Sequence, residues 1–228
     1  MINAIRRATS RKSIWTAVLS ITVCVSAAAQ TATTAFGRQM EKVDLSVSAI
    51  GEFTPTTTDP NYLQQTVASV PSNTLGTLVE LRYIKSPRVG FEFNYSYARY
   101  NDTISISGGI LASQPPYVLG VQSKVNEYSF GYVAHGPTFG NLKTFGSIGV
   151  GGIAFKPTAG GGIGLPEQLR SAFYYSVGVE QGFSEDRYGV RVFFRQSFFG
   201  TPDFNQIYIA TDARSITTQP GIGFWVRF

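Results

Sequence analysis

Cysteine, histidine and charged residues are all scarce in this chain. It contains one cysteine, Cys24, and one histidine, His135, and Asp, Glu, Lys and Arg make up 14% of its 228 residues. Disulfides and zinc sites built from cysteine or several histidines are therefore not expected. A metal site would need three or more converging carboxylates, and no such spacing is visible. We expect neither a metal nor a cofactor.

Long uncharged runs are also lacking, except near the N-terminus. Four basic residues between Arg6 and Lys12 precede an uncharged run that ends in Ala27-Ala28-Ala29. This order predicts a cleaved signal peptide over residues 1–29, followed by an N-terminal segment over 30–41. A retained membrane anchor is the alternative, but the sixteen uncharged residues from Ile14 to Ala29 fall short of the roughly twenty in a spanning helix.

Removal of the signal would bring the chain close to neutrality. Four of the 19 basic residues lie in it, whereas all 14 acidic residues follow it. The overall pI of about 9.3 therefore does not indicate nucleic acid as a partner, and no basic patch with interleaved aromatics supports one. No later uncharged run is long enough for a spanning helix, so the mature chain can enter a bilayer only as a closed sheet.

Apolar residues alternate with polar ones over most of the mature chain, which is the period of a β-strand. The fifth segment alternates poorly because glycines crowd it, and Pro220 predicts a bulge or a late start in the last one. The pattern predicts an all-β barrel of eight antiparallel up-and-down strands within residues 42–228. Its strands are Val43 to Phe53, Val79 to Tyr83, Val89 to Ala98, Glu127 to Tyr132, Leu142 to Phe155, Phe173 to Glu180, Tyr188 to Phe198 and Gly221 to Phe228.

The connections between these strands alternate in length. Long ones span 54–74, 101–122, 156–168 and 200–214, and short ones are Ser86-Pro87, His135 to Asn141 and Ser184 to Asp186. Short turns at one end and long loops at the other, with both termini at the short end, are typical of bacterial outer-membrane barrels. A soluble lipocalin-like barrel is the alternative. Its apolar face would point inward, and the many large aromatics here would overfill a lumen of eight strands.

The last eight residues, Gly221 to Phe228, are similar to the C-terminal strand of outer-membrane proteins, which ends in an aromatic residue read by the barrel assembly machinery. Together with the signal and the strands, residues 40–228 resemble the small barrels of the outer membrane protein A and X type. The resemblance implies a monomer in a Gram-negative-type outer membrane, with periplasmic termini and with the assembly machinery and periplasmic chaperones as transient partners. Phe228 would be the assembly signal. No peptidoglycan-binding domain is expected.

Seven charged residues fall on the face that would line the lumen, and in so narrow a space they should form ion pairs. The interpretation is a structural charge network, with a gate or selectivity filter as the functional alternative. Arg99 is the exception, because it faces lipid and should lie at the outer rim. The seven are Glu80, Arg82, Glu92, Glu127, Glu180, Arg191 and Arg195.

No catalytic constellation is evident. His135 is expected in a solvated turn, and the glycine-rich stretch from Gly160 to Gly164 lacks the lysine of a phosphate cradle. Four loop acids could form an acid pair, but acids are ordinary in loops. We therefore expect a non-enzymatic scaffold that acts through surface loops, with an unknown surface ligand. A narrow pore is the second hypothesis and an enzyme the third. The four loop acids are Asp102, Glu167, Asp203 and Asp212.

Overall fold

The computed structural model describes residues 35–108, 117–159, 164–184 and 186–228. The predicted signal peptide and residues 160–163 of the glycine-rich stretch lie outside these ranges. The described residues belong to two units, residues 35–43 with Phe228, and residues 44–227. In the first unit, α2 (Ala35–Met40) is a short helix, and the Phe228 N–H donates to the Val43 carbonyl over 3.2 Å. Within the described ranges, no helix has the length and apolar character to cross a membrane.

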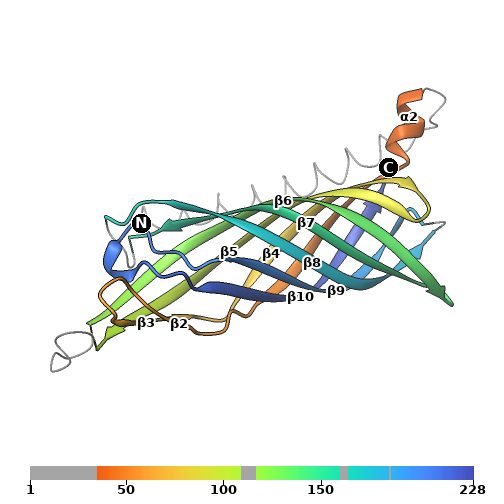
Figure 1. Cartoon of the computed structure of the whole chain (residues 1–228). Coiled ribbons are helices and arrows are strands. Elements are labelled where there is room, and N and C mark those ends of the chain that lie inside the picture. The colour runs from red at the N-terminus through yellow and green to blue at the C-terminus, as the bar shows by residue number, and fades with distance from the viewer. Residues whose placement is uncertain (1–34, 109–116, 160–163, 185) are drawn as a thin grey trace, which may run out of the picture. The chain divides into compact units, whose positions relative to one another are not determined.

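The second unit is a closed ring of eight strands, as predicted (Figure 1). In space the order is β5-β4-β1-β10-β9-β8-β7-β6, and β6 pairs with β5 to close the ring. The strands are β1 (Val43–Glu52), β4 (Thr74–Ser86), β5 (Val89–Ser107), β6 (Tyr117–Phe139), β7 (Leu142–Pro157), β8 (Gln168–Phe183), β9 (Tyr188–Gly200) and β10 (Arg214–Arg227).

The alternation in the sequence decides which side chains fill the ring. Successive side chains of a strand point to opposite faces. On β5, Glu92 and Asn94 point inward and are 2% exposed, whereas Phe93 between them is 46% exposed. The same alternation runs along the other strands. The ring therefore encloses polar residues and presents apolar ones outward.

Two strands are much longer than predicted, so the expected 101–122 loop is wrong at both of its ends. β5 continues to Ser107 and β6 begins at Tyr117. The loop expected over 54–74 holds a hairpin of β2 (Thr57–Pro60) and β3 (Thr66–Pro71), and β3 pairs with the extension of β5. The extension still alternates: Ile104 and Ile106 are buried, whereas Thr103 and Ser107 are exposed and Ser105 is half-buried. Because every second residue of the extension is polar, its composition resembles that of a loop.

Pro220 is paired in mid-strand, contrary to the expected bulge or late start. It lies opposite Phe194 in an unbroken register between β10 and β9. Proline has no backbone N–H, and at position 220 the absent donor would point toward β1 and not toward β9. On that same side the Thr218 N–H, two residues earlier, donates to the Phe53 carbonyl. The register with β1 accordingly runs to Gly221 and resumes as an isolated bridge at Thr218.

The glycines that weaken the alternation of β7 make room for one large lumen side chain. A Cβ on Gly149 would lie 2.5 Å from Cε1 of Tyr174, and one on Gly131 of β6 would lie 2.1 Å from its hydroxyl. Neither distance is possible for a real Cβ contact. Tyr174 is fully buried as a result, in a lumen that these two glycines widen locally.

An apolar cluster fills the lumen at the end where β5 and β6 extend, which we call the loop end. Inward residues of these strands pack there with Phe204 and Ile209 of the segment between β9 and β10, where Ile207–Ile209 form the short helix η1. The cluster comprises Val67, Ile104, Ile106, Val121, Val125, Ile153, Phe155, Ala172, Phe199, Phe204 and Ile209.

Candidate functional site

The seven charged residues predicted to line the lumen are all buried inside the ring, each 4% exposed or less. They come from β4, β5, β6, β8 and β9. Strand parity places them on the inner face, and antiparallel pairing brings opposite charges level: Arg82 lies opposite Glu92, and Arg191 lies opposite Glu180. The lumen therefore holds ion pairs built into the strand register.

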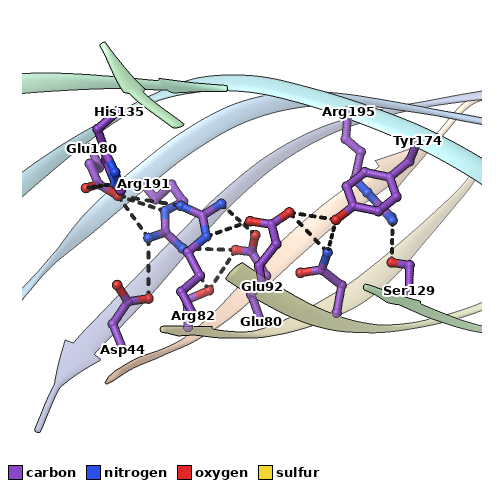
Figure 2. Close-up of polar contacts among 12 residues, drawn as sticks. Asp44, Glu80, Arg82, Glu92, Ser129, His135, Tyr174, Glu180, Arg191 and Arg195 are labelled. Carbon is purple, nitrogen blue, oxygen red and sulfur yellow. Dashed lines mark hydrogen bonds and ion pairs between the residues drawn. The ribbon is translucent and has the colours of Figure 1, made fainter. Parts of the chain in front are cut away.

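Arg82 lies at the centre of the first charge cluster, which we define as Asp44, Glu80, Arg82, Glu92, Glu180 and Arg191 (Figure 2). Its Nε is 2.8 Å from Oε2 of Glu92, and its Nη2 is 3.0 Å from Oε1 of Glu80. A third carboxylate, that of Glu180, lies 3.8 Å from Nη1. One guanidinium is thus in contact with acids from three strands.

Arg191 on β9 contacts two of the same acids, Glu80 and Glu180. Its Nη2 is 2.9 Å from Oε2 of Glu180, and its Nη1 is 3.1 Å from Oε2 of Glu80. Asp44 lies 3.6 Å away, and Ser46 donates to Glu80 over 2.7 Å. Because each carboxylate has a cation or a hydroxyl donor, the desolvation cost of these charges is opposed by several charge-assisted hydrogen bonds.

His135 contacts the first charge cluster, and its expected place in a solvated turn is wrong. β6 continues to Phe139, so His135 lies within the strand. Its side chain is 12% exposed, and Nε2 is 3.5 Å from Oε1 of Glu180. The turn follows at Gly140, whose φ of +62° suits glycine. The inward parity of residue 135 was the available signal.

A second charge cluster surrounds Arg195, closer to the loop end. Its guanidinium pairs with the Glu127 carboxylate, and Nη1 donates to Oε1 of Gln219 over 2.9 Å. Gln219 in turn donates to Glu52 over 3.2 Å. Ser129 accepts from Nη2 over 3.1 Å. This cluster therefore spans the lumen from β6 to β1.

Aromatic rings stack on arginines of both clusters, and one of them, Tyr174, connects the two clusters. Arg82 stacks over Phe145 with a distance of 4.4 Å to the ring centroid, and Arg195 stacks over Tyr174 at 4.3 Å. The Tyr174 hydroxyl donates to Glu92 over 2.9 Å, so it joins the first cluster while its ring supports the second (Figure 2). Phe145 packs in an apolar layer with Ile50, Leu78, Val133 and Phe193.

A small cavity lies where the second charge cluster meets the apolar cluster of the loop end. It is lined by Glu52, Tyr100 and Phe155, among others, and has a volume of about 10 Å³. That is about the space of one water molecule. Charged, aromatic and apolar layers thus fill the ring one above another.

The four loop acids do not form an acid pair. Asp102 lies on β5, not in a loop, and its two carboxylate oxygens share one hydrogen bond from the Ser69 hydroxyl. Glu167 lies 3.6 Å from Lys156, and Asp203 lies 2.7 Å from Arg170. Asp212 and Asp203 line the same cleft without a hydrogen bond between them. No group of three or more potential metal ligands occurs in the described part of the chain.

This cleft has a volume of about 770 Å³ and lies at the loop end, between the turn after β2 and the segment that joins β9 to β10. Hydrogen bonds and an ion pair fix Asp203 in its polar lining. Burial opposes ionisation of Asp203, but hydrogen bonds from Gln168 and the Asn205 N–H, together with Arg170, hold its pKa below the ordinary 3.8. The cleft is lined mainly by Asp59, Asn61, Tyr62, Arg170, Asp203, Asp212 and Arg214.

Besides His135, sequence reasoning left three lumen residues out of the predicted charge network. Asp44, Glu52 and Tyr174 all had inward parity, which was the signal that could have found them. The cleft could not have been found in this way, because it depends on how segments from both halves of the chain meet. Arg99 is exposed on the outer face of β5, as predicted, and its Nη2 donates to Gln122.

Comparisons with known proteins agree on the fold. No protein-family model matches the chain, and no curated protein matches it significantly. Among solved structures, Neisserial surface protein A matches with a TM-score of 0.52 and 10% identity, over 82% of this chain and 97% of that one. The outer membrane protein OprG from Pseudomonas aeruginosa matches with a TM-score of 0.54 and 11% identity, over 82% and 95%. The chain therefore has the fold of small eight-stranded outer-membrane barrels.

Proposed function

We propose that the ring is an integral outer-membrane protein. The supporting observation is its outward face, which carries large apolar side chains on every side. Val47 on β1, Phe130 on β6, Phe173 on β8 and Phe224 on β10 are each 46–57% exposed. An apolar surface of this extent is rare on a water-soluble monomer, and it matches the lipid-facing band of transmembrane barrels.

The filled lumen argues that the protein does not act as a pore. Two buried charge clusters, the apolar group around Phe145 and the apolar cluster at the loop end all lie across the path of a solute. Opening it would separate buried ion pairs, which is costly. We infer that the barrel is a non-enzymatic scaffold, and that the charge network serves its stability.

The working surface is then the loop end, which we place outside the cell, with the short turns and both termini in the periplasm. The 770 Å³ cleft offers carboxylates, amides, two arginines and the exposed ring of Tyr62, which is 64% exposed. A surface-interaction role for this end is the function that the geometry favours.

Two measurements test the proposal. The refolded chain should give almost no conductance in planar bilayers, and the double variant R191Q/R195Q should leak small ions because Glu180 and Glu127 lose their main cations. Large, steady conductance of the unmodified protein would contradict the scaffold hypothesis and favour the pore hypothesis.

Orientation can be read from single cysteines, because a chain without residues 1–29 has none. A membrane-impermeant maleimide on intact cells should label Tyr62→Cys at the loop end and should not label Arg88→Cys in a short turn. Folded protein should also migrate faster than boiled protein on a cold detergent gel. Labelling of Arg88→Cys alone would reverse the orientation.

A further inference from the structure

Three basic residues form a row on the outer face of the barrel, at the same register on neighbouring strands. Arg99 on β5 lies opposite Lys124 on β6, and Lys124 lies opposite Lys156 on β7. All three are exposed and point away from the lumen. Neighbouring strands are about 4.8 Å apart, so the three backbone positions span about 10 Å. We call Arg99, Lys124 and Lys156 the basic row.

The charge of the basic row is not balanced on its own strands. The acids on β5 and β6, Glu92, Asp102 and Glu127, are all buried on the inner face, and β7 has none. Glu167 contacts Lys156 at one end of the row, at 3.6 Å. Among the described residues, none forms a hydrogen bond or an ion pair with the Lys124 ammonium. Three cations thus face outward with one carboxylate beside them.

The position of the row along the barrel corresponds to a membrane surface. Ten residues separate Arg99 from Val89, at the short-turn end of β5. At about 3.3 Å per residue and a tilt of about 40°, this is about 25 Å along the barrel axis, the height of the apolar band of such barrels. The outward residues of β5 between them include Phe93 and Tyr97, both exposed and aromatic.

Polar groups begin at the row and continue above it. Gln122, the next outward residue of β6, accepts from Arg99 and also from the Thr158 hydroxyl over 2.8 Å. Below the row, Tyr128 is 51% exposed and lies at the level where aromatic girdles form. The row therefore lies between an aromatic girdle and a hydrogen-bonding rim, which is the level of lipid headgroups.

We propose that the basic row is a binding site for a phosphorylated lipid of the outer leaflet, one that carries two phosphate groups. Guanidinium and ammonium groups bind phosphate through charge-assisted hydrogen bonds, and a span of about 10 Å accommodates two phosphates on one headgroup. The apolar strands below would receive the acyl chains. This assignment rests on the proposed membrane insertion, with the loop end in the outer leaflet.

The test uses the folded chain in bilayer nanodiscs of phosphatidylcholine with a few per cent of lipid A, which carries two phosphates. Lipids that stay with the protein on release into detergent are counted by native mass spectrometry. A surface cation contributes about fivefold to the binding of anionic lipid. The variant R99Q/K124Q/K156Q should therefore retain lipid A about a hundredfold less well, and monophosphorylated lipid A should bind the unmodified protein more weakly than lipid A does.

The matched control is K85Q/R88Q/R187Q, which removes three exposed basic residues at the short-turn end. It should retain lipid A normally. Equal retention by the row variant and the unmodified protein, or an equal loss in the control, would overturn the site. Should the triple variant fail to fold, K124Q/K156Q with a salt titration replaces it. A nanodisc has two equivalent leaflets, so reversed orientation in cells would refute the proposed function without changing this result.

Discussion

Replacing Arg191 with glutamine would remove the cation that joins two walls of the lumen. Glu180 would lose its contacts from Nε at 3.1 Å and Nη2 at 2.9 Å, and would keep only His135 at 3.5 Å and Arg82 at 3.8 Å. Glu80 would keep Arg82 at 3.0 Å and Ser46 at 2.7 Å. One buried carboxylate is therefore left poorly compensated, and a second remains well paired.

Breaking a buried ion pair costs about 3–5 kcal/mol. Because Glu80 retains its partners, we expect the lower end, about 3 kcal/mol, which is a factor of more than a hundred in the unfolding equilibrium. The assay is urea unfolding in lipid vesicles. A chain without residues 1–29 has a single tryptophan, Trp225, which is 2% exposed and reports on the barrel interior.

Two further variants make the reasoning refutable. Arg88→Gln changes an exposed turn residue and should cost less than about 0.5 kcal/mol. The double variant E180Q/R191Q removes the uncompensated charge with its partner, so it should cost less than R191Q alone. A loss below about 1 kcal/mol for R191Q, or a double variant as costly as the sum of the single changes, would show that the lumen pairs do not stabilise the fold.

The sequence was sufficient to predict the eight strands of the ring, though not their ends, and the face on which each lumen charge lies. Alternation has a period of two, so the apolar positions of β9 also place Arg191 and Arg195 inside. The contact between Glu80 and Arg191 could not be predicted, because they are 111 residues apart in the sequence. Such contacts depend on the stagger of the closed ring, which no local pattern encodes.

Composition led to wrong strand ends where the strands extend beyond the apolar band. Thr103, Ser105 and Ser107 face outward there and made the end of β5 resemble a loop, although the alternate residues Ile104 and Ile106 are buried. The same bias toward short strands placed His135 in a turn. The role of Phe228 as an assembly signal stays a prediction, since it concerns partners that act during folding.

Three other changes probe separate parts of the barrel. Gly149→Ala would place a Cβ 2.5 Å from the Tyr174 ring and should destabilise the barrel by about 1–3 kcal/mol in urea unfolding. Gly120→Ala, with nothing within 4 Å, should not. The pKa of Asp203 is lowered, so its contribution to loop stability is present above its ordinary pKa of 3.8 and is lost as pH falls through the folded value. Amide exchange at Phe204 and Asn205 should therefore accelerate in acid, and Asp203→Asn should accelerate it at pH 7 while Asp212→Asn does not. Tyr174→Phe keeps the ring under Arg195 but removes the hydroxyl that donates to Glu92 and accepts from Asn94. Its cost should be about 1–3 kcal/mol, because two buried polar groups lose a partner while the packing is unchanged. If Tyr174→Phe unfolds at the same urea concentration as the unmodified chain, the hydroxyl does not couple the two charge clusters.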